Sequence, residues 1–472
     1  MRIENKTYRF YSLFLCFVVS MPLHFQFSIL NFPFLIILCT RAIYSEVHSM
    51  EVLKIGSTGP DVKVVQSLLN RAAFNAGTVD GVFGRQTQQA VMAFQRLFGL
   101  SADGVVGAAT WAIMEKYLKG YDVYTVRPGD TLYRIARNYG TTVRDIVMAN
   151  PGVNLAFIYP GQRLVVPYWI EVVFTDVDYT YDEMVRDIEG LKARYPFLET
   201  GIAGKSVLGK NLYYLRLGRG PKEVFYNASH HAIEWITTPL VMKFAENYLK
   251  AYAQGTSLRG YDIQKLWDQV SIYIMPMVNP DGVDLAIRGL TRDNPYYSQL
   301  LQWNRTGQPF SKVWKANIRG VDLNRNYPAG WEQAKAMEPS LGIRGPGPTR
   351  FGGPYPLSEP ETQAVVNFTK MHNFRLVIAY HTQGRVIYWT YQNLTPPESR
   401  SIAEAFARAS GYEVSNVPYE ASYAGYKDWF IQDYRRPGFT MEVGSGTSPV
   451  PLSQFPGIYN ENEGVMLLGA TL

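Results

Sequence analysis

The alternation of strand-like and helix-like segments over residues 175–472 constrains the fold more than any other feature. Five apolar runs are typical of strands: LYYLRLG, EVFYNAS, VSIYIMPMV, FRLVIAYH and GFTMEV. Helical patterns such as TPLVMKFAENYLKAYAQ and EPETQAVVNFTKM lie between them. Strands that alternate with helices form a mostly parallel sheet covered on both faces. This region is therefore predicted to be one α/β domain with a mostly parallel mixed sheet flanked by helices.

Two smaller units are predicted ahead of it, because 472 residues exceed what one hydrophobic core usually organises. Residues 53–117 contain a repeat, DGVFGRQT and DGVVGAAT, in which an Asp-Gly turn is followed by a helical pattern. With the segment DVKVVQSLLNRA, the repeat predicts a small three-helix domain. Residues 123–167 combine YTVRPGDTLYRIARNYG, TTVRDIVMANPG and GQRLVVP, which predicts a βααβ unit.

Composition narrows the possible chemistry. The formal charge of +6 is mild for this length, and no run of lysine or arginine indicates nucleic-acid binding. The two cysteines, Cys16 and Cys39, both lie in an apolar N-terminal segment, which excludes a disulfide framework and a cysteine-ligated metal elsewhere. Any metal ion must be held by histidine, aspartate or glutamate.

Residues 1–49 have two interpretations. The apolar stretch 10–39 follows three basic residues, which is typical of a signal peptide or a membrane anchor. This interpretation predicts membrane contact through residues 10–39 and a location in the cell wall, outside the cell or anchored to the membrane. Alternatively, translation starts at Met50, and the protein is then cytoplasmic or spore-associated.

Four residues suggest a metal site. His231 and Glu234 follow the strand EVFYNA, His381 ends the strand FRLVIAYH, and Glu442 lies in FTMEV. Sites in such sheets form beyond the carboxyl ends of strands. Two imidazoles and a carboxylate make a three-ligand zinc site that leaves a position for water, and a second glutamate can take the proton from that water. A satisfied loop histidine and a buried glutamate ion pair are the structural alternatives for His231 and Glu442.

The two N-terminal units resemble wall-binding modules. The paired DGVxGxxT phrases are similar to the peptidoglycan-binding domain of bacterial wall hydrolases, and the resemblance covers residues 53–117. The phrases PGDTL and PGQRLVVP resemble those of a LysM domain over residues 123–167. The LysM resemblance implies binding of glycans that contain N-acetylglucosamine.

The third unit resembles the zinc carboxypeptidases of the carboxypeptidase A type. The motifs HHAIEWIT, NPDGV, GVDLNRN, AYHTQG, YKDW and FTMEVG occur in the family's order and span nearly all of residues 175–472. The resemblance implies one zinc ion on His231, Glu234 and His381, with Glu442 as general base. His230 is then a flanking residue that packs or forms a hydrogen bond.

Further roles are implied by the same motifs. Asp322 matches the aspartate that hydrogen-bonds a zinc histidine, which fixes the tautomer of that histidine. Asn324 and Arg325 match the pair that binds the terminal carboxylate of the substrate, for which a guanidinium is well suited. Tyr419 corresponds to the mobile tyrosine of the family, with Tyr423 as the alternative.

Two positions depart from the family pattern. The phrase VWKANIRG has Lys315 where the family has its transition-state arginine, so either Lys315 or Arg319 polarises the substrate carbonyl, and Asn317 is a weaker alternative. Lys427 falls at the position that, in the family, lines the floor of the specificity pocket, and a lysine there favours an anionic side chain. The second carboxylate of meso-diaminopimelate is such a group, and pairing of Lys427 with Asp428 is the alternative.

Together these features predict a zinc metallopeptidase that hydrolyses peptidoglycan stem peptides. The combination resembles the bacterial γ-D-glutamyl-diaminopimelate peptidases, which implies cleavage of that bond by zinc-activated water with a glutamate general base. The partners implied are peptidoglycan glycan and stem peptides. The alternatives are a general metallocarboxypeptidase that removes C-terminal residues from peptides, and a non-catalytic wall-binding protein.

Overall fold

The structure, a computed structural model, describes residues 51–154 and 156–472. The predicted membrane contact through residues 10–39 and both cysteines lie outside the described residues. Within the described ranges, no helix is long and apolar enough to cross a membrane.

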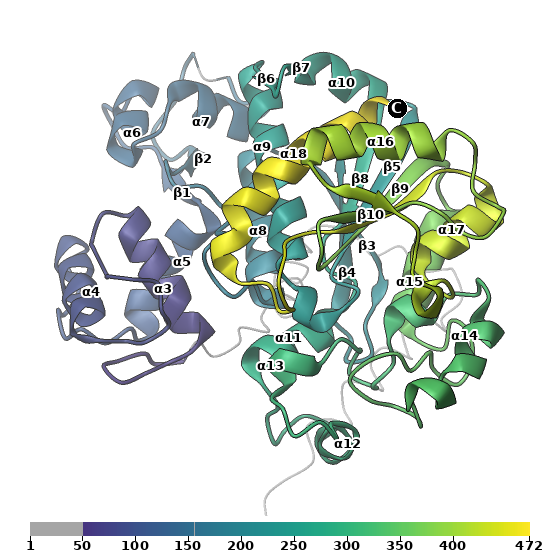
Figure 1. Cartoon of the computed structure of the whole chain (residues 1–472). Coiled ribbons are helices and arrows are strands. Elements are labelled where there is room, and N and C mark those ends of the chain that lie inside the picture. The colour runs from purple at the N-terminus through teal and green to yellow at the C-terminus, as the bar shows by residue number, and fades with distance from the viewer. Residues whose placement is uncertain (1–50, 155) are drawn as a thin grey trace, which may run out of the picture. The chain divides into compact units, whose positions relative to one another are not determined.

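The first unit consists of helices α3 (Pro60–Arg71), α4 (Arg85–Leu97) and α5 (Ala108–Lys119), as predicted (Figure 1). The sequence repeat is also a structural repeat. Gln66 on α3 donates to Asp80 at 2.9 Å, and Gln95 on α4 donates to Asp103 at 2.9 Å. Each glutamine is buried and fixes one Asp-Gly turn, which explains why the phrase occurs twice.

The second unit has the predicted βααβ order: β1 (Tyr121–Thr125), α6 (Leu132–Tyr139), α7 (Val143–Ala149) and β2 (Arg163–Pro167). Strands β1 and β2 pair antiparallel. The side chains of Thr131 and Thr142 accept hydrogen bonds from backbone amides in the first turns of α6 and α7.

The remaining region is an eight-stranded mixed sheet flanked by helices, in the order β11-β10-β12-β9-β5-β8-β4-β3. Its strands are β3 (Glu199–Lys205), β4 (Asn211–Leu217), β5 (Lys222–Ala228), β8 (Val270–Met275), β9 (Phe374–His381), β10 (Val386–Tyr388), β11 (Glu413–Ser415) and β12 (Gly438–Glu442). A separate two-stranded ladder is formed by β6 (Ser257–Leu258) and β7 (Tyr261–Asp262). The neighbours β12, β9, β5 and β8 are parallel, and β4 and β3 add antiparallel pairs at one edge. The predicted α/β class with a mostly parallel mixed sheet is confirmed.

The helices of this region are α8 (Tyr181–Arg194), α9 (Thr237–Gln254), α10 (Ile263–Gln269), α11 (Pro280–Arg288), α12 (Tyr297–Trp303), α13 (Phe310–Val313), α14 (Trp331–Met337), α15 (Pro360–Lys370), α16 (Ser399–Ser410), α17 (Tyr426–Tyr434) and α18 (Phe455–Thr471). Short 3₁₀ turns are η1 (Ala232–Glu234), η2 (Leu323–Arg325), η3 (Pro339–Leu341), η4 (Tyr419–Ala421) and η5 (Leu452–Gln454). Turns η1, η2 and η4 carry residues of the predicted site.

The two faces of the sheet have separate cores, because successive side chains of a strand point to opposite sides. Leu376 and Ile378 of β9 pack in the cluster that includes α9 and α18. Val377 and Ala379 pack in the cluster that includes α15 and α17. By the same alternation, His381 belongs to the α15–α17 face.

The three-helix unit and the βααβ unit differ in their cores. The apolar side chains of α3, α4 and α5 belong to the same cluster as those of α9 and α18, whereas the βααβ unit has a cluster of its own.

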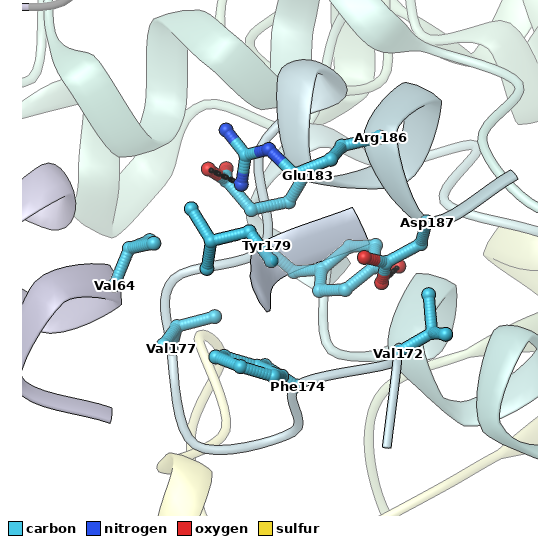
Figure 2. A pocket seen from close by; sticks show the side chains of 9 residues that line it. Val64, Val172, Phe174, Val177, Tyr179, Glu183, Arg186 and Asp187 are labelled. Atoms are coloured by element: carbon cyan, nitrogen blue, oxygen red, sulfur yellow. Dashed lines mark hydrogen bonds and ion pairs between the residues drawn. The ribbon is translucent and has the colours of Figure 1, made fainter. Parts of the chain in front are cut away.

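Ion pairs also hold α3. Lys63 of α3 pairs with Asp178 at 2.8 Å, and Arg71 pairs with Asp176 at 3.0 Å. Figure 2 shows a small cavity whose lining includes Val64 and Val177, and none of its lining residues belongs to the predicted site.

Candidate metal centre

The sheet register brings the predicted site residues to one edge. β5 and β9 are parallel neighbours, and Ala228 pairs with Tyr380, so the loop after β5 begins beside His381. β12 is the neighbour of β9 on its other side, and Glu442 pairs directly with His381. Paired residues of parallel strands have side chains on the same face. The strands alone therefore align Glu442 with His381.

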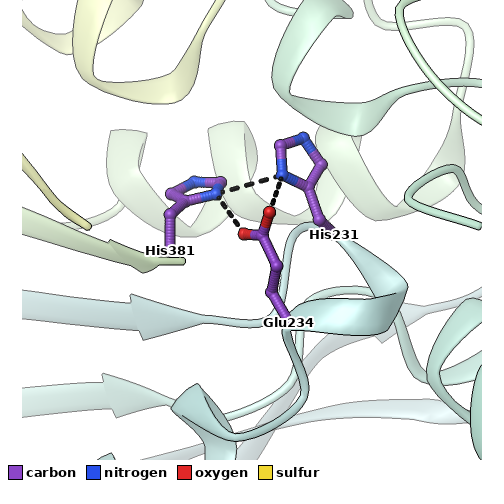
Figure 3. A group of neighbouring side chains, drawn as sticks. All are labelled: His231, Glu234 and His381. Atoms are coloured by element: carbon purple, nitrogen blue, oxygen red, sulfur yellow. Dashed lines mark hydrogen bonds and ion pairs between the residues drawn. The ribbon is translucent and has the colours of Figure 1, made fainter. Parts of the chain in front are cut away.

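His231, Glu234 and His381 converge, as Figure 3 shows. Their nearest nitrogen and oxygen atoms all lie within 4.8 Å of one another. The Nδ1 atoms of His231 and His381 each lie 3.0 Å from an oxygen of the Glu234 carboxylate, and 3.3 Å from each other. Two ring nitrogens and one carboxylate form a donor set that suits zinc.

The electrostatics of His231 also fit a cation at this point. Its Nε2 lies 3.0 Å from Asp322, which accepts the Nε2 proton and leaves Nδ1 facing the carboxylate of Glu234. Burial lowers the pKa of His231, but the charges of Glu234 and Asp322 outweigh burial and raise it to about 9. Positive charge is therefore favoured between His231 and Glu234, and either a proton or a metal ion can supply it.

The carboxylate of Asp322 is held at both of its oxygens. Burial opposes ionisation of its carboxyl group, but His231 and Arg325 outweigh burial and hold the pKa of Asp322 below its ordinary value. Its second oxygen accepts the backbone N–H of Arg350 at 2.8 Å. A carboxylate held on both oxygens keeps the His231 ring in one orientation.

Of the two alternatives for the electrophile, only Lys315 contacts the metal group. Its Nζ donates to Glu234 Oε1 at 2.7 Å. Arg319 instead contacts the hydroxyl of Tyr296 at 3.3 Å and the carboxylate of Glu359 at 3.8 Å. Asn317 is buried and donates to Glu359.

Glu442 differs from Glu234 in its surroundings. Within residues 51–154 and 156–472, its carboxyl group has no hydrogen bond and no ion pair. Burial and the charge of Glu234 raise the pKa of Glu442 to about 8, although Lys315 and His231 oppose the shift. This carboxyl group is close to the metal group without being one of its three members.

The predicted carboxylate-binding residues, Asn324 and Arg325, lie on η2 and contact α17 and η4. Asn324 accepts the backbone N–H of Tyr426 at 3.1 Å, and Arg325 donates to the backbone carbonyl of Glu420. Tyr419 is 69% exposed. Its alternative, Tyr423, is partly buried against the α15–α17 core.

Lys427 is engaged inside the protein. It is buried, and its ammonium group donates to Asp428 and, at 2.6 Å, to the carbonyl oxygen of Thr390. These contacts match the alternative interpretation, in which Lys427 pairs with Asp428. An ammonium group that is already paired with a carboxylate is poorly placed to bind an anionic substrate.

His230, the neighbour of His231, packs and forms a hydrogen bond, as expected. It is fully buried, its Nε2 lies 2.9 Å from the hydroxyl of Tyr327, and its ring centroid lies 5.6 Å from that of His381. Sequence reasoning missed Arg350, because no motif contains it and its contact with Asp322 is made by the backbone.

Comparison with known proteins identifies the family of this chain. A model of the zinc carboxypeptidases, peptidase family M14, matches residues 184–463. The sequence is also 45% identical to γ-D-glutamyl-L-diamino acid endopeptidase 1 of Lysinibacillus sphaericus, over 74% of this chain and 99% of the relative. The chain belongs to the zinc carboxypeptidase family. Zinc is therefore its cofactor, and the His-Glu-His group can hold it.

Further matches concern the N-terminal domains of this zinc carboxypeptidase and two more relatives. Models of a peptidoglycan-binding domain and a LysM domain match residues 58–114 and 124–167, so the chain carries domains that associate with the cell wall. It is 36% identical to the uncharacterised protein YqgT of Bacillus subtilis, over 66% of this chain and 81% of that protein. Carboxypeptidase A of Helicoverpa armigera is 19% identical with a TM-score of 0.48, covering 89% of this chain and 97% of that one.

Proposed function

We propose that the protein is a zinc peptidase of the cell wall that hydrolyses the bond between γ-D-glutamate and a diamino acid in peptidoglycan stem peptides. The observation that carries the proposal is the 45% identity to an endopeptidase named for this bond, which extends over 99% of that relative. Two domains matched by wall-binding models precede the peptidase region on the same chain.

His231, Glu234 and His381 are the proposed zinc ligands. The support is their convergence within 4.8 Å and the contact of His231 with Asp322. When bound there, zinc supplies a Lewis acid that lowers the pKa of water and polarises a carbonyl group. Asp322 keeps the proton of His231 on Nε2 and so leaves Nδ1 free to ligate.

Glu442 is the proposed general base. It accepts a proton from the attacking water and donates it to the amine of the leaving diamino acid, so that one water molecule is consumed for each bond cleaved. Lys315 is the proposed electrophile, since its ammonium group already reaches Glu234 at 2.7 Å. A small movement of this side chain lets its ammonium group donate a hydrogen bond to the carbonyl oxygen of the scissile bond and so polarise it.

Arg325 and Asn324 are proposed to hold the carboxylate of the leaving diamino acid. Arg325 is largely buried, and the carbonyl of Glu420 is its partner in the structure. A substrate carboxylate replaces that carbonyl, because a charge-assisted pair is stronger than a hydrogen bond to a neutral acceptor. Tyr419, which is exposed on the same η4 turn, then covers the substrate.

One experiment separates the three candidate functions. The full chain, with its zinc content measured, is incubated with a muropeptide, a free stem peptide and an N-blocked dipeptide. The proposal predicts release of the diamino acid from both stem substrates and slow cleavage of the blocked dipeptide. Efficient cleavage of the dipeptide alone indicates a general carboxypeptidase, and no cleavage with full zinc content indicates a binding protein.

The location outside the cytoplasmic membrane is also a proposal. Its support is the match of two regions to domains that bind peptidoglycan. Fractionation of producing cells, followed by detection of the chain in wall, membrane and cytoplasmic fractions, tests it. Recovery in the cytoplasm alone supports the alternative start at Met50.

A further inference from the structure

The segment 349–353 lies against the turn that carries the proposed carboxylate-binding residues. The backbone N–H of Arg350 donates to Asp322 Oδ2 at 2.8 Å, and that of Asp322 donates to the carbonyl of Phe351 at 2.8 Å. The Asn326 side chain donates to the carbonyl of Gly352 at 2.8 Å. Arg325 also donates its N–H to the Asp322 carbonyl at 2.9 Å. Arg350 and Arg325 are therefore both anchored to Asp322.

Arg350 has an unusual backbone and an unengaged side chain. Its φ is 65°, in the left-handed region that residues other than glycine seldom adopt. Such a conformation persists only when its surroundings enforce it, here through the hydrogen bond to Asp322. The residue is exposed, and within the described parts of the chain its guanidinium has no hydrogen bond and no ion pair.

Three lysines around this end of the site are engaged by protein partners. Lys427 is bound by Asp428 and Thr390, and Lys315 by Glu234. Lys335 pairs with Glu338 at 2.8 Å and also donates to the carbonyl of Gly353. Each of these ammonium groups would have to leave a protein partner before binding an anion, whereas Arg350 would not.

Arg325 and Arg350 also influence each other. Burial lowers the pKa of Arg325, the charge of Asp322 opposes this shift, and the positive charge of Arg350 adds to it. The two guanidinium groups are therefore close enough to interact, and two neighbouring cations favour a ligand with two negative charges. A diamino acid such as diaminopimelate has two carboxylates, and its lysine counterpart has one.

We propose that Arg350 is a specificity-determining residue that binds the side-chain carboxylate of the leaving diamino acid while Arg325 binds its α-carboxylate. This inference rests on the proposed function and assigns to Arg350 the recognition that the sequence had suggested for Lys427. A guanidinium suits the task, because its fork can donate two parallel hydrogen bonds to one carboxylate.

The test compares kcat/KM of the zinc-loaded full chain on γ-D-Glu-diaminopimelate and γ-D-Glu-lysine peptides. The native protein is expected to prefer the diaminopimelate peptide by about ten- to a hundred-fold, the range of one charge-assisted contact. Arg350→Gly tolerates the positive φ and removes the guanidinium, so most of this preference is expected to disappear. Arg350→Asn, which also tolerates that conformation, is the second variant if the glycine variant does not fold.

Arg400→Ala is the matched control. Arg400 is an exposed arginine on α16, pairs with Glu404 at 3.1 Å and contacts no residue of the site. Loss of the preference in the Arg350 variant and its retention in the control support the proposal. The role of Arg350 is overturned if the preference survives its removal, or if the native protein has no preference. The proposed function still stands in both cases, because both peptides are cleaved. If neither peptide is cleaved, the proposed function and this inference fall together.

Discussion

The two ends of the site differ in how their side chains are engaged. At the metal end, His231, Glu234 and His381 face one another and share partners. At the carboxylate end, which comprises Asn324, Arg325, Tyr419 and Lys427, the cations are bound by the protein itself and the tyrosine is exposed. A metal site needs preformed geometry, whereas a substrate site can exchange internal partners for the ligand when it binds.

The largest effect is expected from Glu442, which lies beside the metal end without belonging to it. Glu442→Gln is expected to lower kcat by about 10²–10⁴, because the general base is lost. Zinc content should stay at the native level. Both are measured on the same preparation, by stem-peptide hydrolysis and metal analysis, and a parallel loss of zinc would make Glu442 a ligand.

Lys427 tests whether the carboxylate end contains a structural ion pair. Lys427→Met leaves the buried carboxylate of Asp428 without its partner and is expected to lower the free energy of unfolding by about 3–5 kcal/mol. The preference between diaminopimelate and lysine peptides should be retained in the folded fraction. Denaturant unfolding measures the first quantity, and a stable variant that has lost the preference would return the specificity role to Lys427.

Asp322 tests how the metal end is held together. Asp322→Asn removes the charge that fixes the His231 tautomer and is expected to weaken zinc binding by about 10–100-fold. Competition with a chelator of known affinity measures the change. Thr349→Val is a matched control, since Thr349 meets the same carboxylate only at 3.4 Å. Equal effects of the two substitutions would argue against a special role of the Asp322–His231 contact.

A graded effect, about tenfold per pH unit, is expected at the metal end alone. In the zinc-free protein the pKa of His231 is raised to about 9, so a proton competes with zinc below that pH. Apparent zinc affinity should therefore rise with pH by about tenfold per unit between pH 7 and 9 and then level off. Zinc titrations across this range measure it. An affinity that is flat from pH 7 would mean that His231 is not a ligand.

The same contrast explains what the sequence could predict. The strands that lead to His231, Glu234 and His381 have continuous apolar runs, so the sequence reveals them. Because these strands pair in parallel, their carboxyl ends, and with them the three residues, lie at the same edge of the sheet. Strands β10 and β11 escaped prediction because each has only three residues, and β3 because its segment ETGIAGK contains two glycines and no continuous apolar run.

Side-chain partners at the carboxylate end were harder to predict. Arg325 meets the carbonyl of a residue 95 positions away, and Lys427 meets one 37 positions away. Such contacts depend on how loops pack, and neither residue type nor local spacing encodes them. Asp428 was foreseen as an alternative partner of Lys427, because it is the adjacent residue.

The metal end is proposed to cleave a γ-D-glutamyl–diamino acid bond. The most direct measurement is a competition in which the zinc-loaded full chain meets equimolar L-Ala-γ-D-Glu-diaminopimelate and an N-blocked dipeptide, with products identified by mass. Early release of L-Ala-D-Glu and free diaminopimelate is expected from the native protein. The Glu442→Gln variant should release them at no more than about a hundredth of the native rate. Preferential cleavage of the blocked dipeptide, with the tripeptide left intact, would contradict it.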